Sequence, residues 1–244
     1  TWLLPPERGA SFYSTGGLVA VHAPKLERNA IYNSLYQREV YATSGERILL
    51  WFNLLDSENG ITPMGRERNI SQKPQFEVTA IGSFKQKPGC PEYVHTAMSA
   101  GEHSRLCLNE CYNPSNERNK IDRIEIVKIT PTTELDSISN NIQDPWKVFT
   151  CNDKGEGCSA NFFDDEYVLN NKSSLYYARA IQEPTNMVGG DPLRCELNEA
   201  GECIKIRPCY SSGPDFDPND DCLAPVGERA WSSPIFLTHP MSLY

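Results

Sequence analysis

Nine cysteines and four histidines are the residues of this sequence whose types suggest chemistry most directly. No C-x-x-C pair occurs and histidine is scarce, so a zinc finger or zinc ribbon is not expected. Short-range disulfides fit the spacing better, and because disulfides persist in oxidising compartments, they predict a secreted or periplasmic location. The cysteines are Cys90, Cys107, Cys111, Cys151, Cys158, Cys195, Cys203, Cys209 and Cys222.

The spacing of the cysteines favours particular pairs, each closing a short loop that should contribute about 2–4 kcal/mol. The odd count leaves one thiol over, and the spacing leaves open which one it is. Cys90 is expected to pair with either Cys107 or Cys111. The other expected pairs are Cys151–Cys158, Cys195–Cys203 and Cys209–Cys222.

His22 is the candidate catalytic residue. It lies at the end of the short apolar run Leu18–Ala23, which is typical of a buried strand. If this run is a strand of an α/β barrel, His22 faces the rim where such barrels bind substrate or metal. The alternative is a packed or surface histidine. Arg38 should lie nearer the opposite end of the strand and brace the join to the next domain. Arg38 and Arg47 also flank the Thr43–Gly45 turn, which could bind an anion through guanidinium and backbone N–H groups; a solvated turn with two surface arginines is the alternative.

Two acidic segments raise the possibility of calcium. Asp153 and Glu156 lie between Cys151 and Cys158, but their spacing does not match an EF-hand loop. A second acidic run precedes Cys222. Solvated loops explain both segments more simply, so calcium is kept only as the alternative. The residues of the second run are Asp215, Asp217, Asp220 and Asp221.

The overall composition bounds the class of protein. Hydrophobic residues make up 39% and charged residues 23% of the 244 residues, as in ordinary globular proteins. The net charge of −9 argues against a nucleic-acid-binding surface. No apolar run approaches the ~20 residues of a membrane span. Because the sequence begins with Thr1, we expect it to be part of a longer gene product.

The expected elements indicate an α+β, mainly β, fold. The strand Leu18–Ala23 and the helix Leu26–Arg38 form one strand–helix unit within residues 1–45, and Ile48–Phe52 is its return strand. Residues 46–244 are expected to form a mainly antiparallel, sandwich-like domain with a cysteine-rich insertion at about 85–119. Its strands are expected at Ile48–Leu55, Gln75–Phe84, Ile121–Thr130, Ser174–Ile181 and Ala230–Leu237.

Three separated motifs resemble one bacterial family of the polymerase-and-histidinol-phosphatase (PHP) superfamily, catalogued as a domain of unknown function. They are R-E-V-Y-A-T-S-G-E-R-I-L-L-W-F at Arg38–Phe52, Y-Y-A-R-A-I-Q-E-P-T at Tyr176–Thr185 and A-W-S-S-P-I-F at Ala230–Phe236. The resemblance implies that residues 1–45 are the last strand–helix unit of an incomplete PHP-type barrel. A disulfide-stapled antiparallel β-sandwich would follow it.

The resemblance also implies a function. The full-length protein would be an exported, metal-dependent phosphoesterase that holds zinc, manganese or iron and acts on an unidentified small-molecule or phosphate-ester substrate. The H-x-H motif expected of that metal site is absent here, so this chain should carry no metal ligand of the family. Its partner would be the missing N-terminal part of the barrel, and it should not be catalytic alone. The alternative is a non-catalytic β-sandwich module that recognises a glycan or a partner protein.

Overall fold

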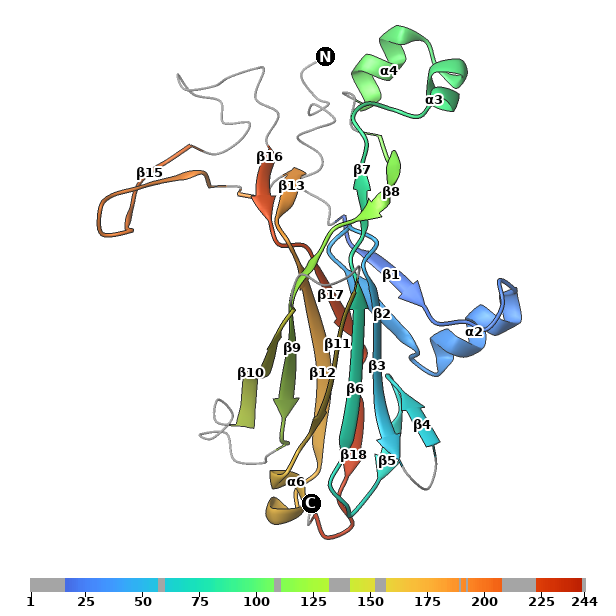
Figure 1. Ribbon diagram of the computed structural model, residues 1–244, viewed down its shortest axis with the longest axis vertical. Coiled ribbons are helices and arrows are strands. Elements are labelled where there is room, and N and C mark those ends of the chain that lie inside the picture. Colours follow the sequence, from blue (N-terminus) through green and yellow to red (C-terminus); the bar gives the residue numbers. More distant parts are fainter. Residues whose placement is uncertain are drawn as a thin grey trace, which may run out of the picture. The chain divides into compact units, whose positions relative to one another are not determined.

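The computed structural model describes residues 16–56, 60–107, 111–131, 141–151, 157–188, 190–191, 193–207 and 223–242. The chain divides into two compact units. The sandwich unit contains Gly17–Gln86, Pro114–Gln182 and Arg229–Tyr244. The cysteine-rich unit contains Thr1–Gly16, Lys87–Asn113 and Glu183–Glu228. Strands predominate among the described residues (Figure 1), and none of the helices there is long and apolar enough to cross a membrane.

The larger sheet of the sandwich unit has eight strands (Figure 1). The order is β1-β2-β17-β12-β18-β5, and β9 joins β12 to β10. Every pairing is antiparallel except that of β18 with β5. The strands are β1 (Leu18–Val21), β2 (Val40–Thr43), β5 (Glu67–Asn69), β9 (Ile121–Ile129), β10 (Ile142–Thr150), β12 (Ser174–Gln182), β17 (Arg229–Ser232) and β18 (Ile235–Thr238).

The second sheet has four antiparallel strands in the order β11-β6-β3-β4. Every second residue of β6 is buried, as the alternation of Phe76, Val78 and Ala80 with polar residues predicts. A short ribbon of β7 and β8 also belongs to this unit. The bounds are β3 (Leu49–Asp56), β4 (Gly60–Pro63), β6 (Gln75–Ile81), β7 (Phe84–Gln86), β8 (Pro114–Arg118) and β11 (Gly157–Phe163).

One hydrophobic core joins the inner faces of the two sheets. The Phe76 ring of β6 lies 5.2 Å from Phe162 of β11 and 4.7 Å from Tyr176 of β12. These centroid distances are those of favourable aromatic pairs. Because side chains of both sheets interdigitate in this cluster, the predicted antiparallel sandwich is confirmed. All five predicted strand ranges contribute, with Ala230–Leu237 divided between β17 and β18 at Ser233–Pro234.

Residues 16–45 are arranged differently from the expectation. The helix α2 spans Arg28–Tyr36 rather than Leu26–Arg38, and Ser34 is its one buried residue. β1 pairs antiparallel with β2, and β2 with β17, so both strands belong to the sandwich's own sheet. A barrel helix would bury an apolar face on a parallel sheet, whereas the side chain of Leu35 is 46% exposed. No parallel strand–helix unit is present among the described residues.

The cysteine-rich unit is built from short elements. β13 (Thr185–Val188) pairs with β16 (Leu223–Val226), and β14 (Cys195–Leu197) pairs with β15 (Cys203–Ile206). The predicted hairpin turn at Asn198–Gly201 is confirmed: the Asn198 side chain accepts hydrogen bonds from two backbone N–H groups, and Gly201 has a φ of 80°. α3 (Glu92–Ala97) and α4 (Ala100–Cys107), which the sequence analysis did not predict, lie in the expected insertion.

A buried ion pair lies inside the sandwich. The side chains of Lys128 on β9 and Asp164 are 4% and 0% exposed, and Nζ lies 2.6 Å from Oδ2. The Tyr176 hydroxyl donates to the same oxygen at 2.6 Å, and the Glu166 N–H, at the start of α6 (Glu166–Asn170), donates to Oδ1 at 3.0 Å. Buried charges are tolerated when they are paired and hydrogen-bonded in this way.

Removing Lys128 should therefore destabilise the fold strongly. Lys128→Ala leaves the Asp164 carboxylate buried without its counter-charge, and we expect a loss of about 3–5 kcal/mol in the free energy of unfolding. Lys73→Ala is the matched control, because Lys73 pairs with the adjacent Asp165 at 3.0 Å on an exposed surface, where such pairs contribute less than about 1 kcal/mol. Urea unfolding of both variants measures how much free energy of unfolding each has lost. Equal losses in the two variants would contradict this prediction.

The tyrosines beside Asp164 make stability depend on alkaline pH. Burial raises the pKa of Tyr167 to about 12, with the Asp164 charge adding to the shift. Burial and the same carboxylate also raise the pKa of Tyr176. Because the folded protein holds these protons more tightly than the unfolded chain, the stabilisation is complete below the ordinary tyrosine pKa of about 10. It is lost as pH rises towards the folded values.

We therefore expect the free energy of unfolding to fall between about pH 10 and pH 12. Tyr167→Phe removes one of the two hydroxyls and should flatten that fall. Denaturant unfolding of the parent and the variant across this interval makes the measurement. The same alkaline loss in both proteins would show that Tyr167 does not contribute.

Candidate functional site

His22, the predicted catalytic residue, is held by the backbone of the sandwich unit. Its Nε2 lies 2.8 Å from the carbonyl oxygen of Leu50. Because a carbonyl oxygen only accepts, Nε2 carries the proton and donates. The ring also lies 5.3 Å from Tyr41 and 5.7 Å from Trp51. His22 therefore ties the end of β1 to β3.

His22 belongs to no group of three or more potential metal ligands among the described residues. One group of three potential ligands occurs in that part of the chain, namely Cys90, His103 and Cys111, and it does not include His22. One ring nitrogen of His22 is used in the contact to Leu50. Within the described residues, the geometry of His22 is that of a packing contact that also satisfies a strand carbonyl.

Arg38 has the contacts expected of a bracing residue. Its backbone is left-handed, with a φ of 61°, where α2 leads into β2. Nε donates to the carbonyl oxygen of Gly65 at 2.9 Å, and the guanidinium lies 5.6 Å from the centre of the Phe236 ring on β18. Arg38 thus joins the end of the helix to a turn and to the last strand of the sheet.

The backbone N–H groups of Ser44 and Gly45 in the Thr43–Gly45 turn already donate to other groups of the protein. The Ser44 N–H donates to the Arg229 carbonyl at 2.9 Å, and the Gly45 N–H donates to the Thr43 hydroxyl at 3.3 Å. The Ser44 hydroxyl also accepts from the Arg229 N–H at 2.8 Å. These contacts continue the pairing of β2 with β17, so the turn does not present these N–H groups for binding an anion.

A charged row crosses the sheet at β9, β10 and β12. We name Arg123, Glu125, Asp144 and Arg179 the arginine–carboxylate row. Glu125 is 7% exposed and accepts from Arg123 at 2.7 Å and from Arg179 at 2.6 Å, while Arg179 also donates to Asp144 at 2.7 Å. Burial opposes ionisation of Glu125, but the two arginines outweigh it and lower its pKa. The side chains of this row hold one another in place, and no pattern in the sequence indicated them.

Aromatic side chains adjoin this row. Arg179 is paired across the strands with Trp231 of β17. Tyr177, two residues before Arg179 on β12, has a pKa that burial raises, and the nearby charge of Asp144 adds to the shift. The alternation of β12 places Tyr177 and Arg179 on the same face of the sheet. This combination of fixed charges and amphipathic rings is chemically suited to a polar, non-ionic ligand, because the arginines are already neutralised by carboxylates.

Three disulfides are present among the described residues, and each is a predicted pair or one of the two pairs predicted for Cys90. Cys151–Cys158 and Cys195–Cys203 are confirmed, and Cys90 pairs with Cys111 rather than Cys107. Their Cα–Cα distances of 4.9–5.6 Å are ordinary for disulfides. Disulfides of this kind indicate an oxidising, non-cytoplasmic environment.

Several predicted residues lie outside the described ones. The expected pair Cys209–Cys222 and the side chain of Cys107 are among them. The acidic candidates for calcium, Asp153 and Glu156 in one loop and Asp215, Asp217, Asp220 and Asp221 in the other, also lie outside.

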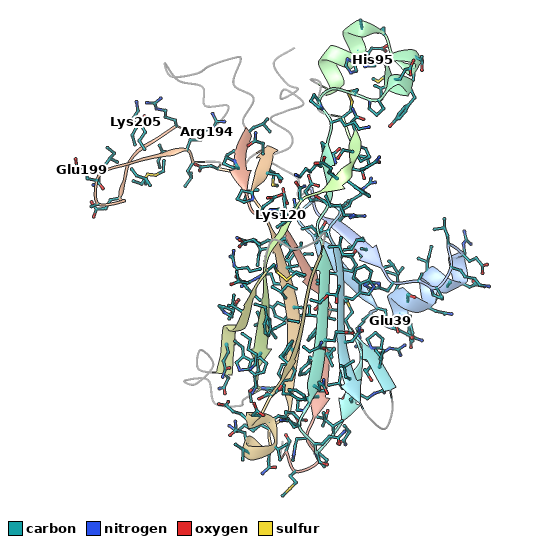
Figure 2. All side chains as sticks on the ribbon, viewed as in Figure 1. Glu39, His95, Lys120, Arg194, Glu199 and Lys205 are labelled. Carbon is teal, nitrogen blue, oxygen red and sulfur yellow. A yellow bond between two sulfur atoms is a disulfide. The ribbon has the colours of Figure 1, made fainter. Side chains whose placement is uncertain are left out.

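The cysteine-rich unit contains a side-chain cluster that the sequence analysis did not anticipate. One ligand atom each from Cys90, His103 and Cys111 lies within 4.8 Å of the others, and the His95 ring centroid is 4.7 Å from that of His103. Figure 2 shows His95 in the α3–α4 segment. The signal in the sequence was two histidines between two cysteines, but their approach depends on how two unpredicted helices pack.

Comparison with known proteins finds one family and a set of partial relatives. A family model described as "Protein of unknown function (DUF3604)" matches residues 7–88. Uncharacterized proteins of Chlamydia muridarum and Chlamydia trachomatis are each 40% identical over 58 residues, which is 24% of this chain and 8% of each relative. One of Chlamydia pneumoniae is 37% identical over 62 residues, or 25% of this chain and 9% of its own length. No solved structure matches.

The contact between Arg38 and Gly65 predicts that substituting alanine for two glycines will have clearly different effects on stability. Gly65 has a φ of 86°, and a Cβ there would lie 2.1 Å from the Arg38 carbonyl oxygen. Gly60 has a similar φ of 77° with no atom within 4 Å of its Cβ position. Gly65→Ala should cost about 2–5 kcal/mol in unfolding free energy, from backbone strain and overpacking. Gly60→Ala should cost only the strain of about 1–2 kcal/mol.

Thermal and urea unfolding of the two alanine variants make the comparison. If Gly60→Ala and Gly65→Ala lose the same stability, Arg38 does not brace this turn through close approach.

Proposed function

We propose that this chain is the C-terminal, non-catalytic portion of an exported, metal-dependent phosphoesterase of the PHP superfamily, and that its sandwich braces the catalytic barrel. The family model over residues 7–88 supports this proposal, because it overlaps the Arg38–Phe52 motif that carries the PHP resemblance. The relatives support it as well: the segment they share with this chain is 8–9% of their length. The chain spans only a small part of the proteins it resembles.

The observation that carries the non-catalytic assignment is the hydrogen bond from His22 to the Leu50 carbonyl at 2.8 Å. This contact supports a role for His22 in holding β1 against β3. In the described part of the sandwich unit, no three potential metal ligands lie together. The zinc, manganese or iron ions and the residues that activate water would then come from the missing barrel portion. The substrate class is a small-molecule phosphate ester.

Export is the second part of the proposal. Three disulfides in one chain are supported only where the compartment is oxidising. A periplasmic or secreted phosphoesterase meets this condition.

A hydrolysis assay tests the catalytic assignment. The 244-residue chain and the chain extended by its preceding residues are each incubated with p-nitrophenyl phosphate and bis-p-nitrophenyl phosphate in zinc, manganese or ferrous iron. We expect turnover only from the extended protein. If the 244-residue chain hydrolyses either substrate, and point variants of that chain abolish the hydrolysis, the proposal is overturned.

His22→Ala in the extended protein makes a finer test. Loss of the donor to Leu50 should lower the free energy of unfolding by about 1–3 kcal/mol. It should change kcat/KM less than about threefold, which corresponds to under ~0.7 kcal/mol. A fall in kcat/KM of about tenfold or more, near 1.4 kcal/mol, with unchanged stability would instead place His22 in the active site.

A glycan-binding module is the second candidate function, and the arginine–carboxylate row beside Trp231 is the observation that favours it. If the row binds a neutral glycan, the wild-type chain is retained on a glycan array or an immobilised polysaccharide. Trp231→Ala then abolishes retention, while Lys73→Ala, on a different surface pair, leaves it unchanged. Retention that survives Trp231→Ala would contradict binding at this face.

A further inference from the structure

The α3–α4 segment gathers four side chains that are suited to a soft or borderline metal ion. The ligand atoms of Cys90, His103 and Cys111 lie within 4.8 Å of one another. The ring of His95 lies 4.7 Å from that of His103, between centroids. Two cysteine sulfurs and two imidazole nitrogens form a ligand set typical of structural zinc sites. The four residues belong to one continuous stretch of the cysteine-rich unit, Lys87–Asn113.

His103 supplies the observation that points to a ligand. The residue is 8% exposed, and its Nε2 is buried without a hydrogen-bond partner among the described residues. Buried polar atoms in native proteins are nearly always satisfied, so such an atom needs an explanation, for example an ion that is not present. The position of His103 beside the two sulfurs makes a metal ion the simplest explanation.

Local hydrogen bonds place His103 independently of any ion. Ser99 and Glu102 form a capping box at the start of α4: the Ser99 N–H donates to Glu102 Oε2 at 3.0 Å, and the Glu102 N–H donates to Ser99 Oγ at 3.3 Å. The His103 N–H then donates to the Ser99 carbonyl at 2.9 Å. Because the helix begins at a fixed residue, the imidazole is positioned in advance.

The ends of the segment are also held together. The Lys87 N–H donates to the Asn113 carbonyl at 2.7 Å, and the Asn113 side chain donates to the Gly89 carbonyl at 3.2 Å. These contacts bring Cys90 and Cys111 close together without requiring a covalent bond between them. The two sulfurs should therefore remain neighbours when they are reduced.

We propose that the reduced form of this segment binds one zinc ion through Cys90, Cys111, His103 and His95. Both thiols release their protons to solvent, so two thiolates and two neutral imidazoles hold the ion, and no electron is transferred. In a tetrahedral zinc site, sulfur and nitrogen ligands lie about 2.3 Å and 2.0–2.1 Å from the ion, so neighbouring ligand atoms are roughly 3.3–3.8 Å apart. The ligand atoms of Cys90, His103 and Cys111 already lie within 4.8 Å of one another. His95, whose ring lies beside that of His103, would turn its side chain to supply the fourth ligand.

The disulfide and the metal-bound form exclude each other, because both use the same two sulfurs. A thiol reductant that supplies two electrons and two protons converts the disulfide into the two thiols. The segment is thus closed by a covalent bond when oxidised and by an ion when reduced. In either form the loop from Cys90 to Cys111 is stapled, which maintains the two short helices.

Cobalt(II) provides the spectroscopic probe, since it occupies zinc sites and gives a thiolate charge-transfer band when sulfur ligates it. The full 244-residue chain is reduced, freed of metal and titrated anaerobically with cobalt(II). We expect the band to rise to one equivalent and to disappear when zinc is added. The oxidised chain should show no band.

Variants locate the ion. His103→Ala keeps both thiols and should weaken cobalt binding at least about tenfold, while Cys90→Ser should abolish the band. The matched control is the double variant Cys195→Ser and Cys203→Ser, which removes another disulfide pair that is not part of a potential metal-ligand group; its titration should be unchanged. If reduced wild type shows no thiolate band, or if the band persists in both Cys90→Ser and His103→Ala, the proposal is wrong.

Discussion

The buried carboxylate of Asp164 is the constraint on which the sandwich depends. Asp164 follows β11 of the smaller sheet, while its partners Lys128 and Tyr176 lie on β9 and β12 of the larger one. Its backbone N–H also donates to the Pro74 carbonyl just before β6, at 3.2 Å. One residue therefore bonds both layers, with its side chain to the larger sheet and its backbone N–H to the segment before β6, and the carboxylate lies in the interior, where an unpaired charge would be too costly to retain. This requirement restricts the relative position of the two sheets more than apolar contacts alone would, since those are non-directional.

An aromatic cluster packs around this ion pair and links it to the rest of the core. Phe76 stacks between Phe162 and Tyr176, and Trp146 lies 5.7 Å from Tyr176 and 5.2 Å from the Lys128 ammonium. The cation is thus bounded by rings as well as by its carboxylate, an arrangement that is favourable for a desolvated ammonium group. A core of this kind is suited to a bracing module, because it supports the larger sheet out to β2, which follows Arg38, and to the edge strand β1, which precedes His22.

The cysteine-rich unit is stabilised by different means. Its described strands are short, and β15 is exposed along its length, so hydrophobic burial contributes little and disulfides compensate for it. The Cys195–Cys203 pair closes a hairpin whose turn is already satisfied by Asn198. The Cys90–Cys111 pair differs because the buried His103 lies beside it, with a nitrogen that has no hydrogen-bond partner within the described part of the chain. Two disulfides of similar appearance therefore have different chemical surroundings.

The sequence by itself determined the features that depend on local rules. The two-residue alternation of Phe76, Val78 and Ala80 specified a half-buried strand, and the Asn198–Gly201 turn specified a hairpin that brings Cys195 and Cys203 within bonding distance. The period of a strand and the chemistry of a turn are short-range properties. Only the tertiary structure decided which strands and side chains are paired with one another. It placed β1 and β2 in the antiparallel sheet, because a four-residue strand pairs equally well in several topologies and the choice depends on β17, almost two hundred residues away. It also paired Lys128 with Asp164, connected His22 to Leu50, and brought His103 to the Cys90–Cys111 sulfurs with His95 beside it. These contacts join residues whose spacing has no period, so no pattern in the sequence indicates them.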